Sequence, residues 1–252
     1  MGPPLAGFVL ASHGPGLVYL INASSFVAVI LGLALMRTSG KPEKDESQPA
    51  RISFSALIEG LRFVWRTPII VQTMTLDFIA TFFASANQLL PIFAKDILRV
   101  GAQGYGFLAA GQAAGAVITG LAMARLGPLK KQGLLVIVSI AVFGAATIAF
   151  GFSRTFWFSL LMLAIAGAAD TISTILRQTI RQLVTPNKLR GRMTSINMIF
   201  FMGGPQLGEV EAGTVAALIG APLSVVTGGA ACFIAAVIAL GTAKNLRRYE
   251  VK

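Results

Sequence analysis

The stretch Lys130–Arg177, KKQGLLVIVSIAVFGAATIAFGFSRTFWFSLLMLAIAGAADTISTILR, contains two apolar segments separated by a short turn. Basic residues stand at both ends of the stretch, whereas the turn carries only Arg154. A helix needs about 20 mostly apolar residues to cross a bilayer, and both segments meet that length. The stretch therefore predicts a helical hairpin that enters a membrane and returns to the same side.

The same alternation of apolar segments and basic clusters continues along the whole chain. Of the 21 Lys and Arg residues, all except Lys95, Arg99 and Arg154 fall into four clusters, at residues 37–66, 125–131, 177–192 and 244–252. Loops rich in Lys and Arg are retained in the cytoplasm during membrane insertion. The pattern predicts a multi-pass protein of the cell (inner or plasma) membrane, with its basic loops and C-terminus in the cytoplasm.

The composition agrees with a membrane protein and excludes several other classes. Charged residues are 12% and apolar residues 55% of the chain, against about 25% charged in a typical soluble domain. The net charge of +11 follows from the basic clusters, which anionic lipid attracts, so no nucleic-acid partner is expected. A single histidine and a single cysteine leave no His- or Cys-based metal site, and we predict no metal or cofactor.

The predicted fold is an all-α integral membrane bundle. Seven segments are long and apolar enough to span, at about 17–36, 69–94, 103–125, 133–152, 155–177, 194–219 and 221–243. We expect 1–36 to be the remnant of an N-terminal bundle, since Gly2–Ala11 is too short to span. We expect 68–243 to be a six-helix bundle and 244–252 a cytoplasmic tail. Seven spans and a stub suggest a chain that has lost its N-terminal part.

Residues 37–67 are expected to form a cytoplasmic linker with an amphipathic helix. The stretch Ser39–Ala50, SGKPEKDESQPA, is polar and contains two prolines, which predicts a mobile linker. After it, apolar residues recur at helical spacing from Phe54 to Trp65. This spacing predicts a helix that lies in the membrane interface.

Four acidic residues fall inside predicted spans, namely Asp77, Asp170, Glu209 and Glu211. Each costs about 2.5–3.5 kcal/mol on insertion scales, so each is a candidate for proton coupling or transport. For Asp77, helix packing through hydroxyls or a basic partner is an equally good interpretation. Asp170 is expected to pair across helices or to line a cavity. We interpret the nearby Arg177 and Arg181 as interface anchors.

Glu209 and Glu211 lie beside a predicted break of their helix at Gly204, Pro205 and Gly208. Two residues turn a regular helix by about 200°, so both acids face one cavity only if the helix is irregular. Pro205 removes a backbone donor and favours such irregularity. Binding sites of transporters are often built at broken helices. The alternative is that the two acids act in gating or helix contacts without touching substrate.

Other polar and small residues in the spans have weaker interpretations. Gly111 and Gly115 form a GxxxG pattern, extended by Gly120, which favours close helix packing. The candidates for lining a cavity are Gln88, Gln112 and Gln206.

Several motifs resemble those of the major facilitator superfamily. TPNKLRGRMTSIN (Thr185–Asn197) resembles the cytoplasmic loop before the eleventh helix of that superfamily, and its Arg190, Gly191 and Arg192 correspond to the loop motif. LGEVEAG (Leu207–Gly213) is similar to a motif of the enterobactin-exporter-like branch. The stretches Leu89–Ala116 and Gly167–Thr179 resemble the seventh-to-eighth helix junction and the tenth helix of that branch.

The resemblance implies a permease that works by alternating access and exports a small organic molecule, with proton coupling as a further hypothesis. It makes 17–36 the sixth helix and the later segments the seventh to twelfth, so most of the N-terminal half would be missing. One departure is that Gly204-Pro205-Gln206 stands where the branch has Ser-Asn-Glu, which removes an acid from the membrane.

The expected partners are a small-molecule substrate, the bilayer, protons and an absent N-terminal half. The alternative is a truncated half that transports nothing alone. An enzyme is not expected, because no nucleophile–base pair stands out.

Overall fold

The computed structural model describes residues 2–35, 54–83, 86–127 and 129–250. All regular structure in these residues is helical, which confirms the predicted all-α class. The long helices are α1 (Gly2–Leu35), α2 (Phe54–Arg66), α3 (Pro68–Phe83), α5 (Gly101–Leu126), α6 (Gln132–Phe152), α7 (Phe156–Val184), α8 (Arg190–Ile219) and α9 (Ala221–Thr242). Short elements complete the chain: η1 (Ala86–Leu89), α4 (Leu90–Ile92), η2 (Phe93–Ile97), η3 (Asn187–Leu189) and α10 (Lys244–Arg247).

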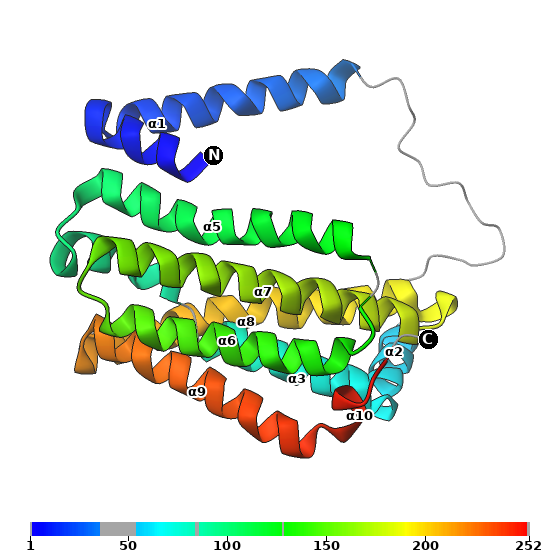
Figure 1. Ribbon diagram of the computed structural model, residues 1–252. Coiled ribbons are helices and arrows are strands. Elements are labelled where there is room, and N and C mark those ends of the chain that lie inside the picture. Colours follow the sequence, from blue (N-terminus) through cyan, green and yellow to red (C-terminus); the bar gives the residue numbers. More distant parts are fainter. Residues whose placement is uncertain (1, 36–53, 84–85, 128, 251–252) are drawn as a thin grey trace.

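Apart from α2, which lies at one end, the long helices lie side by side in one elongated bundle (Figure 1). α6 packs against α7 and α9, α5 packs against α7, and α8 packs against α3 and α9. α1 lies along α5 at the edge of the bundle (Figure 1). Apolar side chains from α3, α6, α7, α9 and α10 form a continuous core, in which Cys232 is fully buried.

Five of the described helices are long and apolar enough to cross a membrane: residues 16–35 of α1, and α5, α6, α7 and α9. This differs from the seven predicted spans at two places. The predicted span 69–94 is divided, because α3 ends at Phe83 and residues 86–97 form shorter helical pieces. α8 is long enough but is less apolar, since Arg190, Arg192, Glu209 and Glu211 all lie on it.

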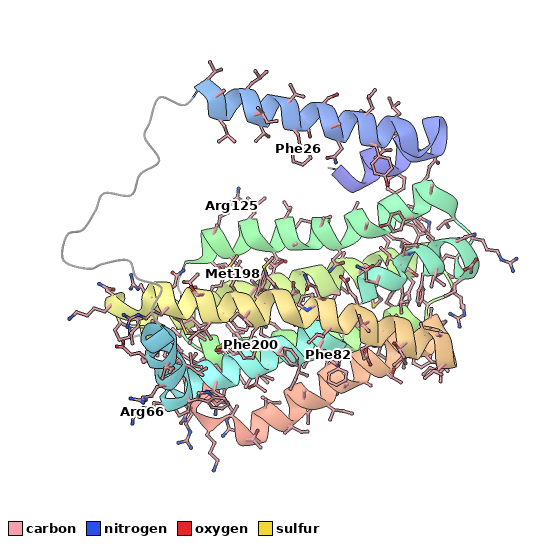
Figure 2. All side chains as sticks on the ribbon, turned by 180° about the vertical axis from the view of Figure 1, so that it is seen from behind. Phe26, Arg66, Phe82, Arg125, Met198 and Phe200 are labelled. Carbon is pink, nitrogen blue, oxygen red and sulfur yellow. The ribbon has the colours of Figure 1, made fainter. Side chains whose placement is uncertain are left out.

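Basic residues gather at one end of the bundle, which we call the basic end. It is formed by α2, the α7–α8 connection and α10, and Arg66 and Arg125 both lie there (Figure 2). The C-terminal α10 packs against α3, α6 and α9 at this end. The side chain of Leu246 is fully buried, and its backbone N–H donates a hydrogen bond to Oε1 of Gln72 over 2.9 Å. The alternation of basic clusters in the sequence thus corresponds to one charged end of the fold.

The predicted amphipathic helix is present as α2. Ile58, Leu61 and Trp65 are exposed along it. Its inner side packs against α8, where a Cβ at Gly60 would lie 3.0 Å from Cδ1 of Ile196. An exposed apolar face beside basic residues suits a helix at a membrane surface. The predicted linker Ser39–Ala50 lies outside the described residues.

Close packing of α5 on α7 depends on the glycines of the GxxxG pattern. A Cβ at Gly115 would lie 1.9 Å from the carbonyl oxygen of Ala164, and a Cβ at Gly111 would lie 2.7 Å from Cδ1 of Leu160. The predicted packing role of these two glycines is confirmed. The extension to Gly120 is wrong, because a Cβ there would meet nothing within 4 Å.

Candidate functional site

Asp77 and Arg177 form an ion pair in the interior of the bundle. Oδ1 of Asp77 on α3 lies 2.7 Å from Nη1 of Arg177 on α7, and the two residues are only 4% and 2% exposed. Nη2 of Arg177 also donates a hydrogen bond to Oγ1 of Thr174 over 3.0 Å. The basic partner considered for Asp77 from sequence is therefore present.

Arg181 extends the ion pair into a network that reaches a third helix. One guanidinium nitrogen lies 3.9 Å from Oδ2 of Asp77 and also donates a hydrogen bond to Oδ1 of Asn197 on α8. α7 packs its backbone against α5 and α6 rather than against α3 or α8. Long arginine side chains thus cross the space that separates α7 from these two helices.

The interpretation of Arg177 and Arg181 as interface anchors is wrong. Both residues are buried, at 2% and 7% exposed, on the same helix as the core residues Leu176 and Ile180. Interface anchors keep their charge in water at the membrane surface. A charge removed from water must instead be paired, and the carboxylate of Asp77 supplies that partner.

Asp170 lies two turns before Arg177 on α7 and is half-buried. It interacts electrostatically with Arg177 and Asp77, but it forms no ion pair with any residue that the structure describes. Asp77, Asp170, Arg177 and Arg181 therefore make up a group of two acids and two bases. We call these four residues the charge network.

The predicted helix break at Gly204, Pro205 and Gly208 is wrong, because α8 is a continuous α-helix with Pro205 inside it. The two glycines serve close packing against α3. A Cβ at Gly204 would lie 2.6 Å from Oγ1 of Thr81, and a Cβ at Gly208 would lie 2.3 Å from the carbonyl oxygen of Phe82. Neighbouring helices can support a proline within a membrane helix. The glycines here bring α3 and α8 together.

A regular α8 places Glu209 and Glu211 on opposite sides. Glu211 is half-buried on the side that packs against α3 and α9, whereas Glu209 is exposed. Glu209 belongs to a row of residues spaced alternately three and four apart, so they share one face of the helix. Every member is exposed in the described chain: Ser195, Ile199, Met202, Gln206, Glu209 and Gly213. We call this row the α8 stripe. The two acids do not form one site.

The remaining candidates form no ion pair with the four residues of the charge network in the described chain. Gln88 is exposed on η1. Gln112 is half-buried on α5, where its backbone carbonyl closely approaches Gly167 of α7. Arg190, Gly191 and Arg192 occupy the first turn of α8 rather than a loop. In that turn Arg192 forms an ion pair with Glu59 of α2.

Sequence reasoning missed the role of the two arginines and of Asn197, although one signal was available. Asp77 lies nine residues after the start of α3 at Pro68. Arg177 lies seven residues before the end of α7 at Val184. Both of these helix termini are at the basic end. The two opposite charges therefore lie at similar depths, about 10–14 Å from that end along their helices. Matching the depths of opposite charges would have suggested the pair.

A bundle with five described helices long and apolar enough to cross a membrane, and with basic connections at one end, is that of a multi-pass membrane protein. Over residues 1–251 the chain matches the family described as transmembrane secretion effector, of the major facilitator superfamily. It belongs to this family, and it is a multi-pass inner-membrane protein.

Curated relatives of the chain are transport proteins. The chain is 28% identical over 251 residues to the enterobactin exporter EntS of Salmonella choleraesuis, and 26% identical to that of Escherichia coli O1:K1. These alignments cover 99% of this chain and 59% of each relative. It is 24% identical over 219 residues to the multidrug efflux pump Tap of Mycolicibacterium fortuitum, which covers 86% of this chain and 53% of that protein. The chain thus spans less than two thirds of the length of these relatives.

Proposed function

We propose that the protein transports a small organic molecule across the membrane by alternating access, and that the transport is outward. The observation that carries the proposal is the charge network, which links α3, α7 and α8 in the interior of a membrane bundle. Charges at such depth are costly, and they mark substrate and ion pathways. The names of the relatives, an exporter and an efflux pump, support the outward direction.

Proton coupling is proposed to act through Asp170 and Asp77. When Asp170 is ionised, Arg177 is attracted by two carboxylates. When Asp170 is protonated, Asp77 is the only carboxylate of the network that attracts Arg177. A proton on Asp170 would therefore change the strength of the contact between α7 and α3, and a two-state bundle responds to such a differential interaction. Glu209 and Glu211 are secondary candidates.

The test measures proton-driven transport in inside-out vesicles, with ethidium and enterobactin as probes. We expect Asp170→Asn to lower the proton-driven rate about tenfold or more, equivalent to about 1.4 kcal/mol. Substrate exchange without a pH gradient should persist, because the folded bundle and its binding site remain. Asp96→Asn is the matched control, since Asp96 is an exposed acid on η2.

Two outcomes would contradict proton coupling. One is unchanged transport in Asp170→Asn, Asp77→Asn, Glu209→Gln and Glu211→Gln. The other is loss of substrate exchange in Asp170→Asn to the same extent as loss of proton-driven transport, which would indicate a structural role.

The α8 stripe is proposed to face a water-filled path or a second group of helices. Gln206 and Glu209 are polar and exposed on it, and facing them toward lipid would be costly. This supports the second candidate, that residues 1–252 transport nothing without further helices that cover the stripe. Reconstitution of residues 1–252 alone in liposomes tests it, and ethidium transport by that chain would contradict it.

The basic end is proposed to lie in the cytoplasm, with the C-terminus on the same side. The clustering of Arg66, Arg125 and Lys244 at one end supports this orientation, because Lys- and Arg-rich segments are retained there. A fluorescent protein fused to the C-terminus should fold and fluoresce. Such a fusion fluoresces when it stays in the cytoplasm and stays dark when it is exported unfolded. A dark fusion at normal expression would contradict the orientation.

A further inference from the structure

A cavity opens between α7 and α8 at the basic end. It has a volume of about 430 Å³ and is lined by the C-terminal part of α7 and the N-terminal part of α8. The polar lining residues that matter below are Gln178, Arg181, Thr185, Arg190 and Asn197. Two of them carry guanidinium groups, and none of the described residues that line the cavity carries a carboxylate.

The charge of Arg181 is only partly compensated. Its carboxylate partner, Asp77, lies 3.9 Å away and is in closer contact with Arg177, at 2.7 Å. Arg177 in turn repels Arg181 electrostatically. Among the described carboxylates, only that of Asp77 is in ion-pair contact with these two buried guanidinium groups, and a buried charge is stable only when it is well paired. Arg181 can therefore accept a second anionic partner from the cavity.

Arg190 lines the same cavity, is exposed, and adds a second guanidinium group. Its guanidinium donates one long hydrogen bond, 3.5 Å, to the carbonyl oxygen of Gln182. It forms no ion pair with a carboxylate in the part of the chain that the structure describes. The planar guanidinium group matches the geometry of carboxylate and phosphate groups.

Thr185 supplies an independent sign of a ligand. It lines the cavity and is only 3% exposed, and its Oγ1 has no hydrogen-bond partner among the described residues. A buried hydroxyl without a partner costs about 1–3 kcal/mol. Buried polar groups in native proteins are nearly always hydrogen-bonded. An oxyanion in the cavity would accept a hydrogen bond from this hydroxyl.

We propose that this cavity binds a carboxylate or phosphate group, held by Arg181 and Arg190 and by the hydroxyl of Thr185. The group belongs either to a free small-molecule anion or to the headgroup of an anionic lipid. A lipid headgroup can reach the cavity because the cavity lies at the basic end of the bundle, at the membrane surface. The site shares Arg181 with the charge network, but its other two groups, Arg190 and Thr185, belong neither to that network nor to the α8 stripe.

The test measures binding to the purified chain in neutral detergent. Inorganic phosphate and citrate are titrated at constant ionic strength. Binding stabilises the folded chain, so it should raise the temperature at which the buried Cys232 becomes reactive toward a maleimide dye. Phosphatidylglycerol is compared with phosphatidylcholine by native mass spectrometry. Saturation by phosphate or citrate identifies a free anion, and selective retention of phosphatidylglycerol identifies a lipid headgroup.

Two variants and one matched control test the site. Arg190→Gln and Thr185→Val should weaken binding about tenfold or more, as expected when a hydrogen bond to a charged group is lost. Thr185→Val removes only an unpaired hydroxyl, so it should fold normally. Arg125→Gln removes an exposed charge from α5 at the same end of the bundle and should change binding less than about twofold.

Three outcomes would overturn the proposal. The first is that phosphate, citrate and phosphatidylglycerol all fail to bind. The second is that Arg190→Gln and Arg125→Gln weaken binding equally, which would indicate general attraction to a basic surface. The third is that Thr185→Val and Arg190→Gln both bind as the parent does.

Discussion

Asp77→Asn is expected to lower the free energy of unfolding of the purified chain by about 3–5 kcal/mol, the usual cost of breaking a buried ion pair by removing one partner. The substitution leaves the guanidinium groups of Arg177 and Arg181 in the interior without the carboxylate that they share. Asn can still accept a hydrogen bond, but it cannot neutralise the charge. Both guanidinium groups would have to be hydrated or moved.

Cys232 provides the measurement. It is the single cysteine of the chain and is fully buried in the core that surrounds the network. A maleimide dye reacts with it only when this core opens, so the labelling rate in rising denaturant reports the free energy of opening. The variant should be labelled at lower denaturant than the parent.

Two controls separate the buried pair from charge loss in general. Glu59→Gln removes the carboxylate of the ion pair between Glu59 and Arg192, which is largely exposed, and should cost no more than about 1 kcal/mol. In the double variant Asp77→Asn with Arg177→Gln, the unfolding free energy should be partly restored. The effects of substitutions at two residues in contact do not simply add. Equal losses in Asp77→Asn and Glu59→Gln would show that the buried pair has no special role.

Gly115→Ala is expected to destabilise the packing of α5 on α7 by about 3 kcal/mol, at the upper end of the range for overpacking. The added methyl group would lie 1.9 Å from the carbonyl oxygen of Ala164. A backbone atom cannot rotate away as a side chain can, so the two helices would have to separate. Separation also weakens the contact of Gly167 with Gln112 on the same interface.

The matched control is Gly120→Ala on the same helix. A Cβ at Gly120 meets nothing within 4 Å, and alanine favours a helix over glycine by up to about 1 kcal/mol. The control should therefore be neutral or more stable. Thermal loss of helical circular dichroism in detergent measures both variants. If the two changes have the same effect, α5 does not approach α7 as closely as the structure shows.

The class of fold could be predicted from sequence because its signals are local. The length of an apolar run, the position of basic residues and the spacing of apolar residues after Phe54 are properties of short segments. They predicted the all-α class, the amphipathic helix and the basic end, but not the division of the span 69–94 after Phe83. The GxxxG pattern of Gly111 and Gly115 is also local, and its packing role follows from the small size of its residues.

The local signal at Pro205 was misleading. A proline beside glycines is typical of an interrupted helix, and the sequence was interpreted in that way. The same glycines, Gly204 and Gly208, allow α3 to approach so closely that α8 continues through the proline. Whether a glycine permits a break or a close contact depends on the neighbouring helix, which is distant in sequence.

By itself, the sequence determined that this is a helical multi-pass membrane protein with one basic end, and it identified the buried acids as candidates. Only the tertiary structure decided which charges meet. Asp77 and Arg177 are 100 residues apart, and their contact depends on the depth and rotation of two helices whose backbones pack against other neighbours. The same geometry placed the Thr185 hydroxyl, which has no hydrogen-bond partner among the described residues, in one cavity with two arginines. Burial is a property of the assembled bundle. For this reason Arg177 and Arg181, which the sequence suggests as anchors at the membrane surface, lie in an interior network.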